Sequence, residues 1–142
     1  MVVLTYPNKI DKIAVGCILV YNEKFLLTHR AKDDKWGSVA GNIEDDESPE
    51  MTINREIMEE LDIDVIPDFF TTTYHDYSGE IVEYNLFVHV FNEDPTEKIN
   101  IDSSSKGFGF FSLDEALKLK LFEDEDYCLK LYMETFSEDE EF

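Results

Sequence analysis

Residues 41–63, GNIEDDESPEMTINREIMEELDI, constrain the fold more than any other segment, because they predict a helix with two contrasting faces. Ser48 can cap this helix, and Pro49 then stands at its first position, where a missing backbone N–H costs nothing. Apolar side chains recur at every fourth position and predict a buried stripe: Ile53, Ile57 and Leu61. The segment is therefore expected to form an amphipathic helix whose other face is acidic.

Three carboxylates share that other face, at spacings of three and four residues: Glu56, Glu59 and Glu60. Like charges repel unless a cation lies among them, and hard oxygen ligands suit Mg²⁺ or Mn²⁺, which bridge carboxylates and substrate phosphates. The alternative is a solvated acidic face, the usual meaning of such a run. That alternative explains neither Arg55 nor the upstream pair Gly41 and Glu47.

The segment resembles the Nudix box, the signature of the Nudix hydrolases. The family pattern has a glycine, a glutamate, an Arg-Glu pair, an aliphatic residue, a Glu-Glu pair, a second glycine and a final aliphatic residue at fixed spacings. Here these positions read Gly41, Glu47, Arg55-Glu56, Ile57, Glu59-Glu60, Asp62 and Ile63. Only Asp62 departs, and aspartate tolerates the left-handed conformation that ends a helix, so we expect activity to persist.

The resemblance implies metal-assisted attack of water on a diphosphate linked to a nucleoside, with Mg²⁺ as the expected cofactor and Mn²⁺ as a possible one. By position, Glu59 and Glu60 match the metal-ligand pair, and Glu56 matches a further ligand or the base that acts on the water. The backbone carbonyl of Ala40 matches another ligand.

Supporting roles follow from the same resemblance. Arg55 and Glu47 match residues that hold the metal-binding side chains in place, and we expect Arg55 to contact a carboxylate. Gly41 permits a tight turn or a close phosphate approach. The family often adds a glutamate from outside the box. There are four candidates, although a solvated surface position explains each of them better: Glu80, Glu83, Glu93 and Glu97.

The rest of the chain predicts an α/β fold. An apolar, β-branched run at residues 13–21 is typical of a central strand, and 24–30 reads as its hairpin partner. The following elements are expected in order: a loop at 31–41, a long hairpin of 65–74 and 80–91 around Ser78-Gly79, an irregular stretch at 92–105, a strand at 107–112, helices at 113–119 and 123–136, and a frayed acidic tail at 137–142. This order predicts a mixed sheet flanked by helices, which is also the α/β/α sandwich that the resemblance implies, in one domain over residues 1–142.

Composition limits the partners and the location. The formal net charge of −21 excludes a general affinity for nucleic acid duplexes or anionic membranes. No apolar run reaches membrane-spanning length, and the start of the chain does not resemble a signal peptide. Cys17 and Cys128 are too few and too far apart for a disulfide framework or a zinc site, so we expect a reducing cytoplasm. Both a monomer and a homodimer remain open.

Substrate-binding residues are harder to assign. Arg30 ends a strand and suits a bidentate phosphate or substrate contact, although a surface arginine would fit equally. Tyr74, His75 and Tyr77 are expected either to line a base pocket or to be ordinary hairpin residues. We retain Arg30, Gly41 and Tyr77 as the substrate-binding candidates.

The loop at 36–44, WGSVAGNIE, resembles the dihydroneopterin triphosphate and dATP pyrophosphohydrolase branch of the MutT-like Nudix enzymes. This points to cleavage of a triphosphate into a monophosphate and pyrophosphate. Nucleotide sugars, ADP-ribose and dinucleoside polyphosphates remain alternative substrates. An alternative of another class is a Nudix-fold module that binds a nucleotide without cleaving it.

Overall fold

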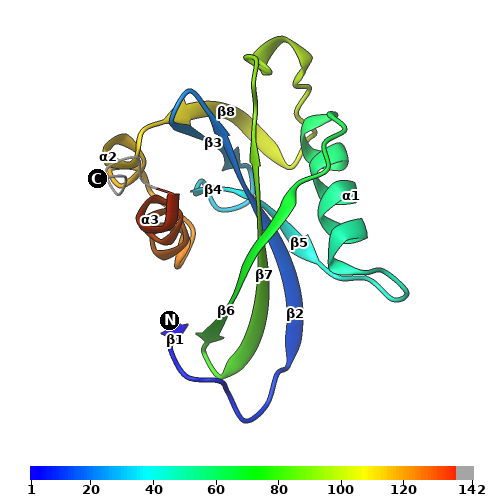
Figure 1. The fold of residues 1–142 in the computed structure, drawn as a ribbon, viewed down its shortest axis with the longest axis vertical. Coiled ribbons are helices and arrows are strands. Elements are labelled where there is room, and N and C mark those ends of the chain that lie inside the picture. The colour runs from blue at the N-terminus through cyan, green and yellow to red at the C-terminus, as the bar shows by residue number, and fades with distance from the viewer. Residues whose placement is uncertain (137–142) are drawn as a thin grey trace.

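The computed structural model describes residues 1–136, so the predicted frayed tail at 137–142 lies outside the described residues. The elements are β1 (Val2–Val3), β2 (Lys12–Tyr21), β3 (Lys24–Arg30), β4 (Trp36–Gly37), β5 (Val39–Asn42), α1 (Pro49–Leu61), β6 (Asp68–Tyr77), β7 (Glu80–Val90), the 3-10 turn η1 (Thr96–Lys98), β8 (Ser105–Phe111), α2 (Leu113–Ala116) and α3 (Glu125–Phe136). A curled, mixed sheet lies between α1 on one side and α2 and α3 on the other (Figure 1). The predicted α/β arrangement is confirmed.

Strand β2 is the centre of the sheet. On one edge it runs parallel to β7 along nearly its whole length. On its other edge it pairs with two antiparallel strands, one after the other. Residues 14–17 pair with β5, and residues 19–21 pair with β3. Because Gly16 pairs with Ala40 and Val15 with Gly41, the start of the box segment is fixed to the middle of the sheet.

Alternating side chains of β2 enter two separate cores. Val15, Cys17 and Leu19 pack with the predicted helix stripe, in which Ile53, Ile57 and Leu61 are fully buried. Ile18 and Val20 face the opposite way, toward α2 and α3. Residues 15–20 of β2 are all buried and carry no charged side chain, because both faces of the strand are covered there.

The predicted loop at 31–41 is wrong in its second half, where the chain forms β4 and most of β5. These strands have two and four residues, and their pairing depends on β3 and β2 rather than on their own composition. The long hairpin begins at Asp68 rather than at residue 65, and α3 begins at Glu125 rather than at residue 123. Strand β1 and the turn η1 were not predicted.

The predicted beginning and end of helix α1 are both confirmed. Ser48 caps α1 and accepts a hydrogen bond from the backbone N–H of Met51, with Pro49 at the first position. Asp62 adopts the left-handed conformation, with φ of 60°, and its backbone N–H donates to the carbonyl of Met58. The substituted glycine position therefore still ends the helix.

None of the helices within residues 1–136 has both the length and the apolar composition that a membrane crossing requires. Cys17 and Cys128 are both free and buried, and burial raises the pKa of each thiol.

Candidate active site

Arg55 is the hub of the acidic face of α1. Its Nε lies 2.7 Å from Glu47 Oε2 and its second terminal nitrogen 3.0 Å from Glu47 Oε1, so the pair is bidentate. Thr52 Oγ1 also donates to Glu47, at 2.9 Å. The guanidinium of Arg55 is the main reason why the pKa of Glu47 falls to about 2. Glu47 therefore remains ionised and holds Arg55 in a fixed orientation.

The remaining terminal nitrogen of Arg55 reaches two other carboxylates of the helix. It lies 3.2 Å from Glu56 Oε2 and 3.2 Å from Glu59 Oε1. The predicted contact between Arg55 and carboxylates is thus present, and it joins Glu47 to the two glutamates. This arrangement restricts the rotamers of Glu56, whose side chain is only 15% exposed.

Glu56 and Glu60 face the sheet beside β5. Burial raises the pKa of both carboxyl groups, and the neighbouring Glu56 raises that of Glu60 further. A Cβ atom built on Gly41 would overlap the carboxyl group of Glu56, so only glycine leaves room for that side chain. Gly41 thus allows a close approach between the strand and a carboxylate.

The residues fit a divalent cation, although the three box glutamates do not converge as side chains. Among residues 1–136, no group of three or more His, Cys, Asp or Glu side chains is arranged to hold a metal ion. The cause is Glu59, which turns toward Arg55 and is 54% exposed. Glu56 and Glu60, in contrast, bring two hard oxygen donors together in a partly buried place, where a divalent ion such as Mg²⁺ would offset their repulsion.

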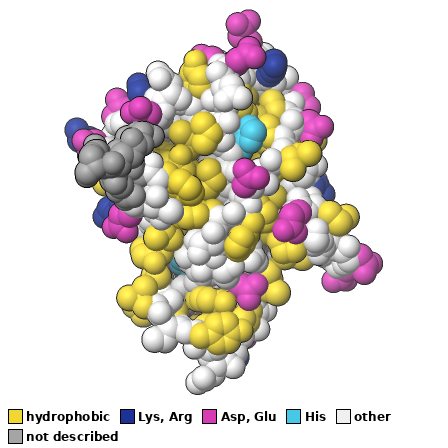
Figure 2. Space-filling model, in the orientation of Figure 1, with side chains coloured by type: hydrophobic (Ala, Val, Ile, Leu, Met, Phe, Trp, Pro, Cys, Tyr) yellow, Lys and Arg dark blue, Asp and Glu magenta, His cyan; other side chains and the backbone are white. Residues whose placement is uncertain are grey.

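A cavity of about 670 Å³ opens beside Glu60, Ala40 and Gly41. Four cationic side chains line it, from β2 and from the end of β3 through the following loop: Lys12, Arg30, Lys32 and Lys35. The whole chain has 12 lysines and arginines against 33 acidic residues, and Figure 2 shows acidic groups scattered over one face of the molecule. One third of the positive charge thus borders the β2 and β3 side of this cavity, which favours an anionic ligand on that side.

Arg30 lies at this cavity with its guanidinium 4.3 Å above the ring of Phe122. Its second terminal nitrogen is 3.0 Å from Asp33 Oδ2, and its charge partly offsets the rise in the pKa of Glu60. Arg30 is therefore close to the box carboxylates rather than on a remote surface.

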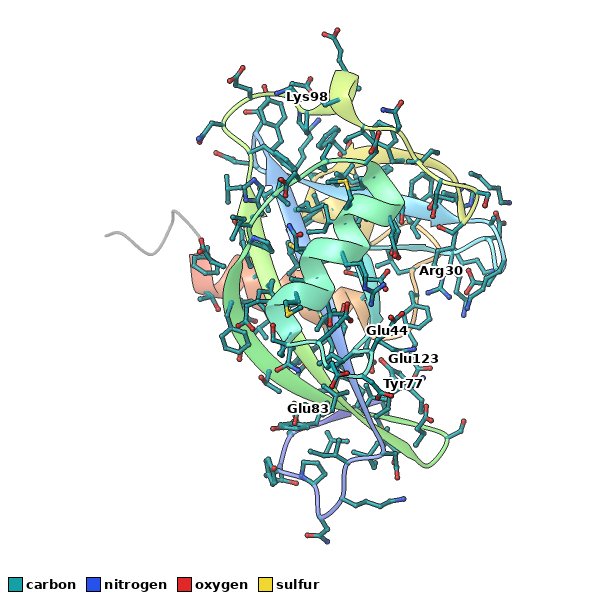
Figure 3. The ribbon with its side chains drawn as sticks, turned by 90° about the vertical axis from the view of Figure 1, so that its right-hand side faces the viewer. Arg30, Glu44, Tyr77, Glu83, Lys98 and Glu123 are labelled. Atoms are coloured by element: carbon teal, nitrogen blue, oxygen red, sulfur yellow. The ribbon has the colours of Figure 1, made fainter. Side chains whose placement is uncertain are left out.

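The three aromatic candidates of the hairpin lie on two different faces of β6, because side chains alternate along a strand. His75 and Tyr77 lie on one face of β6 and line the cavity, where their rings stack with centroids 5.8 Å apart. Tyr74 points to the other face and contacts Tyr6, edge to face. Figure 3 shows Arg30, Tyr77 and Glu123 on the same side of the molecule, although they come from distant parts of the chain.

The start of α3 supplies a wall of the cavity that sequence reasoning missed. Three consecutive acidic residues line it: Glu123, Asp124 and Glu125. Glu125 is buried and accepts hydrogen bonds from the backbone N–H of Ser38 at 2.9 Å and from its hydroxyl at 2.7 Å. Burial raises the pKa of Glu125. An acidic run directly before the last helix was the available signal, but it does not reveal which cavity the run will meet.

Of the four distal glutamates considered, only Glu80 lines this cavity, and it lies 3.9 Å from Lys12 Nζ. Glu83 accepts a hydrogen bond from Asn85 on its own strand. Glu93 borders a separate hollow near the end of α1, and Glu97 lies in η1.

The Glu56–Glu60 pair, which Arg55 orients through Glu56, lies beside a cavity whose β2 and β3 side is cationic. A carboxylate pair suited to a divalent ion next to an anion-binding surface defines the class of a metal-assisted phosphoanhydride hydrolase. The family model described as NUDIX domain matches residues 11–132, so the chain belongs to the Nudix family. The family consists of pyrophosphohydrolases that act on nucleotide-type substrates and depend on a divalent metal ion.

Individual relatives agree with this assignment. The dihydroneopterin triphosphate diphosphatase of Haemophilus influenzae is 31% identical over 86 residues, which are 61% of this chain and 52% of that protein. The chain thus matches about half the length of this relative.

Solved structures share the fold. A MutT protein from Methanosarcina mazei Go1 has a TM-score of 0.72 at 19% identity, covering 96% of this chain and 100% of that one. A bifunctional NMN adenylyltransferase/ADP ribose pyrophosphatase from Francisella tularensis, complexed with AMP and a manganese ion, has a TM-score of 0.69 at 23% identity. That match covers 92% of this chain and 43% of the other.

Proposed function

We propose that this protein hydrolyses a nucleoside or pterin triphosphate to a monophosphate and pyrophosphate, with Mg²⁺ or Mn²⁺ as the metal. The observation that carries the proposal is the cationic border of the cavity beside Glu60, in a chain with a net charge of −21. A triphosphate is the kind of ligand that needs several positive groups next to a metal-binding carboxylate pair. The triphosphate named for the Haemophilus relative supports the same substrate class.

In this proposal Glu56, Glu59, Glu60 and the backbone carbonyl of Ala40 would hold the metal, which requires Glu59 to leave Arg55. A metal ion held there would neutralise phosphate oxygens and lower the pKa of a bound water molecule. Arg55 and Glu47 keep the carboxylates oriented. Arg30 and the neighbouring lysines bind the phosphate chain, and Tyr77 lines the part of the cavity that takes the remainder of the substrate. The alternative role for Glu56 is to accept the proton of the attacking water instead of binding the metal.

ADP-ribose is the alternative substrate that a structural neighbour suggests, because the Francisella protein is an ADP ribose pyrophosphatase. A different alternative is a binding module that does not hydrolyse its nucleotide. The intact set of Glu56, Glu59 and Glu60 argues against that alternative.

A substrate panel separates these possibilities. Nucleoside triphosphates, dihydroneopterin triphosphate, ADP-ribose, nucleotide sugars and dinucleoside polyphosphates are incubated with Mg²⁺, with and without added inorganic pyrophosphatase. Phosphate that appears from a triphosphate only when pyrophosphatase is added supports the proposal. If ADP-ribose is the only compound that is hydrolysed, ADP-ribose rather than a triphosphate is the substrate. If no compound is hydrolysed, the result favours the binding module.

A further inference from the structure

A buried His–Asp pair in the cavity wall has no part in the chemistry described above. His75 is 1% exposed, and its Nδ1 lies 2.8 Å from Asp124 Oδ2, while its Nε2 lies 2.7 Å from Thr73 Oγ1. The pair joins β6 to the start of α3 across 49 residues of sequence. His75 and Asp124 both line the cavity.

The direction of this hydrogen bond follows from its chemistry. An ionised carboxylate only accepts, so Nδ1 of His75 carries the proton and donates it to Asp124. The Thr73 hydroxyl then occupies Nε2, and both ring nitrogens are paired. Because His75 is held on both sides, it fixes where the Asp124 carboxylate lies.

Asp124 has accepting capacity beyond this bond. Its Oδ2 also lies 3.3 Å from the amino group of Met1, which is 2.7 Å from Glu123 Oε2. Within residues 1–136, no hydrogen bond reaches Asp124 Oδ1. Glu125 differs, because both of its oxygens accept from Ser38. Asp124 is therefore the acid of this wall that is both fixed in position and still able to accept a hydrogen bond.

The wall also has a chemical preference. Acidic side chains line this wall, and Asp124 offers a free acceptor there, while the cations of the cavity come from other elements, at its β2 and β3 side. A ring edge with neighbouring N–H donors is complementary to such a wall, whereas an edge of carbonyl acceptors is repelled. A 2-amino-4-oxo heterocycle, as in guanine and pterin, presents an amino group beside a ring N–H.

We propose that Asp124, positioned by His75, accepts a hydrogen bond from the exocyclic amino group of the substrate and thereby selects 2-amino-4-oxo rings. The inference rests on the proposed triphosphatase function, since it places the ring of that substrate at the start of α3. Tyr77, stacked on His75, borders the same place. His75 acts only through Asp124 and is a positioning residue.

The test is equilibrium binding of two analogues that differ only in the amino group. The α,β-methylene analogues of GTP and ITP are titrated into the protein in the presence of Mg²⁺. A hydrogen bond to an ionised group corresponds to about a 10- to 100-fold preference for the GTP analogue. Asp124→Asn should bring this preference close to 1, while Asp126→Asn, which changes an exposed acid of the same run, should leave it unchanged.

The role of His75 is tested by two substitutions. His75→Asn keeps a side-chain N–H and should retain a large part of the preference, whereas His75→Phe should lose it as Asp124→Asn does. The double variant His75→Phe/Asp124→Asn should lose no more than either single variant. If His75→Phe does not fold, the binding preferences of Asp124→Asn and His75→Asn still test the proposal.

An unchanged preference in Asp124→Asn, or wild-type protein that binds both analogues equally or neither, would overturn the inference. Hydrolysis is measured separately on GTP. Cleavage of GTP without a binding preference would contradict the ring selection and leave the triphosphatase function intact. A binding preference without any cleavage would support the ring selection and contradict the triphosphatase function.

Discussion

The cavity has two functional walls, which differ in how far apart in the sequence their residues lie. The α1 wall comes from one helix: Glu60 lines the cavity, and Glu56 and Arg55 lie next to it, a few positions away in the sequence. The α3 wall assembles from segments far apart in the chain, as in the contact of His75 with Asp124 and that of Ser38 with Glu125, 87 residues away. Both walls collect buried or half-buried carboxyl groups with raised pKa values.

The difference lies in how each wall neutralises its charge. On α1, Glu56 and Glu60 repel each other, and of the two only Glu56 contacts Arg55, so the pair needs a further cation. On α3, Glu125 accepts two hydrogen bonds from Ser38 and Asp124 accepts one from His75, so protein donors rather than a metal hold these carboxyl groups. We therefore expect α1 to carry the chemical step and the α3 wall to carry recognition and stability.

Glu56→Gln should lower kcat by about 10³-fold, because loss of a metal ligand costs several kcal/mol of transition-state stabilisation. Steady-state turnover with saturating Mg²⁺ measures it. Glu50→Gln, which changes an exposed glutamate in the first turn of the same helix, should turn over like the wild type. Equal losses in the two variants would mean that helix charge, rather than a ligand, was removed.

Gly41→Ala should lower kcat by about 100-fold, because the added methyl group would occupy the place of the Glu56 carboxyl group. Gly107→Ala is the matched control, since a Cβ atom there meets no atom within 4 Å. Turnover and thermal unfolding are measured for both. If the two alanine variants keep the same turnover, the close approach of β5 to Glu56 has no catalytic role.

Arg55→Lys should lower kcat by about 10-fold with a small change in KM. Lysine keeps the charge but cannot make the bidentate contact with Glu47 while also reaching Glu56 and Glu59. Lys98→Arg serves as a control for the exchange of cationic groups, since Lys98 lies in η1, outside the cavity lining. Wild-type kcat in Arg55→Lys would show that charge alone is enough.

Glu125→Gln probes the other wall and should change stability rather than kcat. Burial raises the pKa of Glu125, so its folded-state pKa lies above its ordinary value near 4.5. A group with a raised pKa contributes stability at low pH, which is lost as the pH rises through the folded-state value. Glutamine can still accept from the Ser38 N–H and donate to its hydroxyl.

Thermal unfolding of this variant is compared with the wild type at pH 4.5 and pH 8. The Tm of Glu125→Gln relative to the wild type should be higher at pH 8 than at pH 4.5, by about 2–4 °C. Asp126→Gln, at the exposed neighbouring position, should show no such pH dependence. The same difference at both pH values would contradict the assignment of Glu125 as a buried acid.

The two walls also differ in what the sequence could predict. The cap at Ser48, the stripe on α1, the contact of Arg55 with carboxylates and the helix end at Asp62 all depend on residues within one or two turns of each other, and all are present. Their geometry follows from helical periodicity alone. The late glycine was replaced, yet the backbone kept the same conformation.

Long-range pairing set the limits of prediction. Strands β4 and β5 are too short to show a period, and β3 and β2 impose their pairing. The turn of Glu59 toward Arg55 depends on a choice of rotamer that spacing does not specify. The run at 123–126 was predicted to be helix, and its role as a cavity wall depends on contacts with β6 and with Ser38.

The central claim is that the close pair of Glu56 and Glu60 makes α1 the metal-binding and catalytic wall. Glu60→Gln tests it most directly, by calorimetric titration of Mn²⁺ together with Mg²⁺-dependent turnover, with thermal unfolding as the check on folding. We predict that the variant folds like the wild type, loses measurable Mn²⁺ binding and has no metal-dependent hydrolysis. Wild-type Mn²⁺ binding and turnover in folded Glu60→Gln would contradict the account.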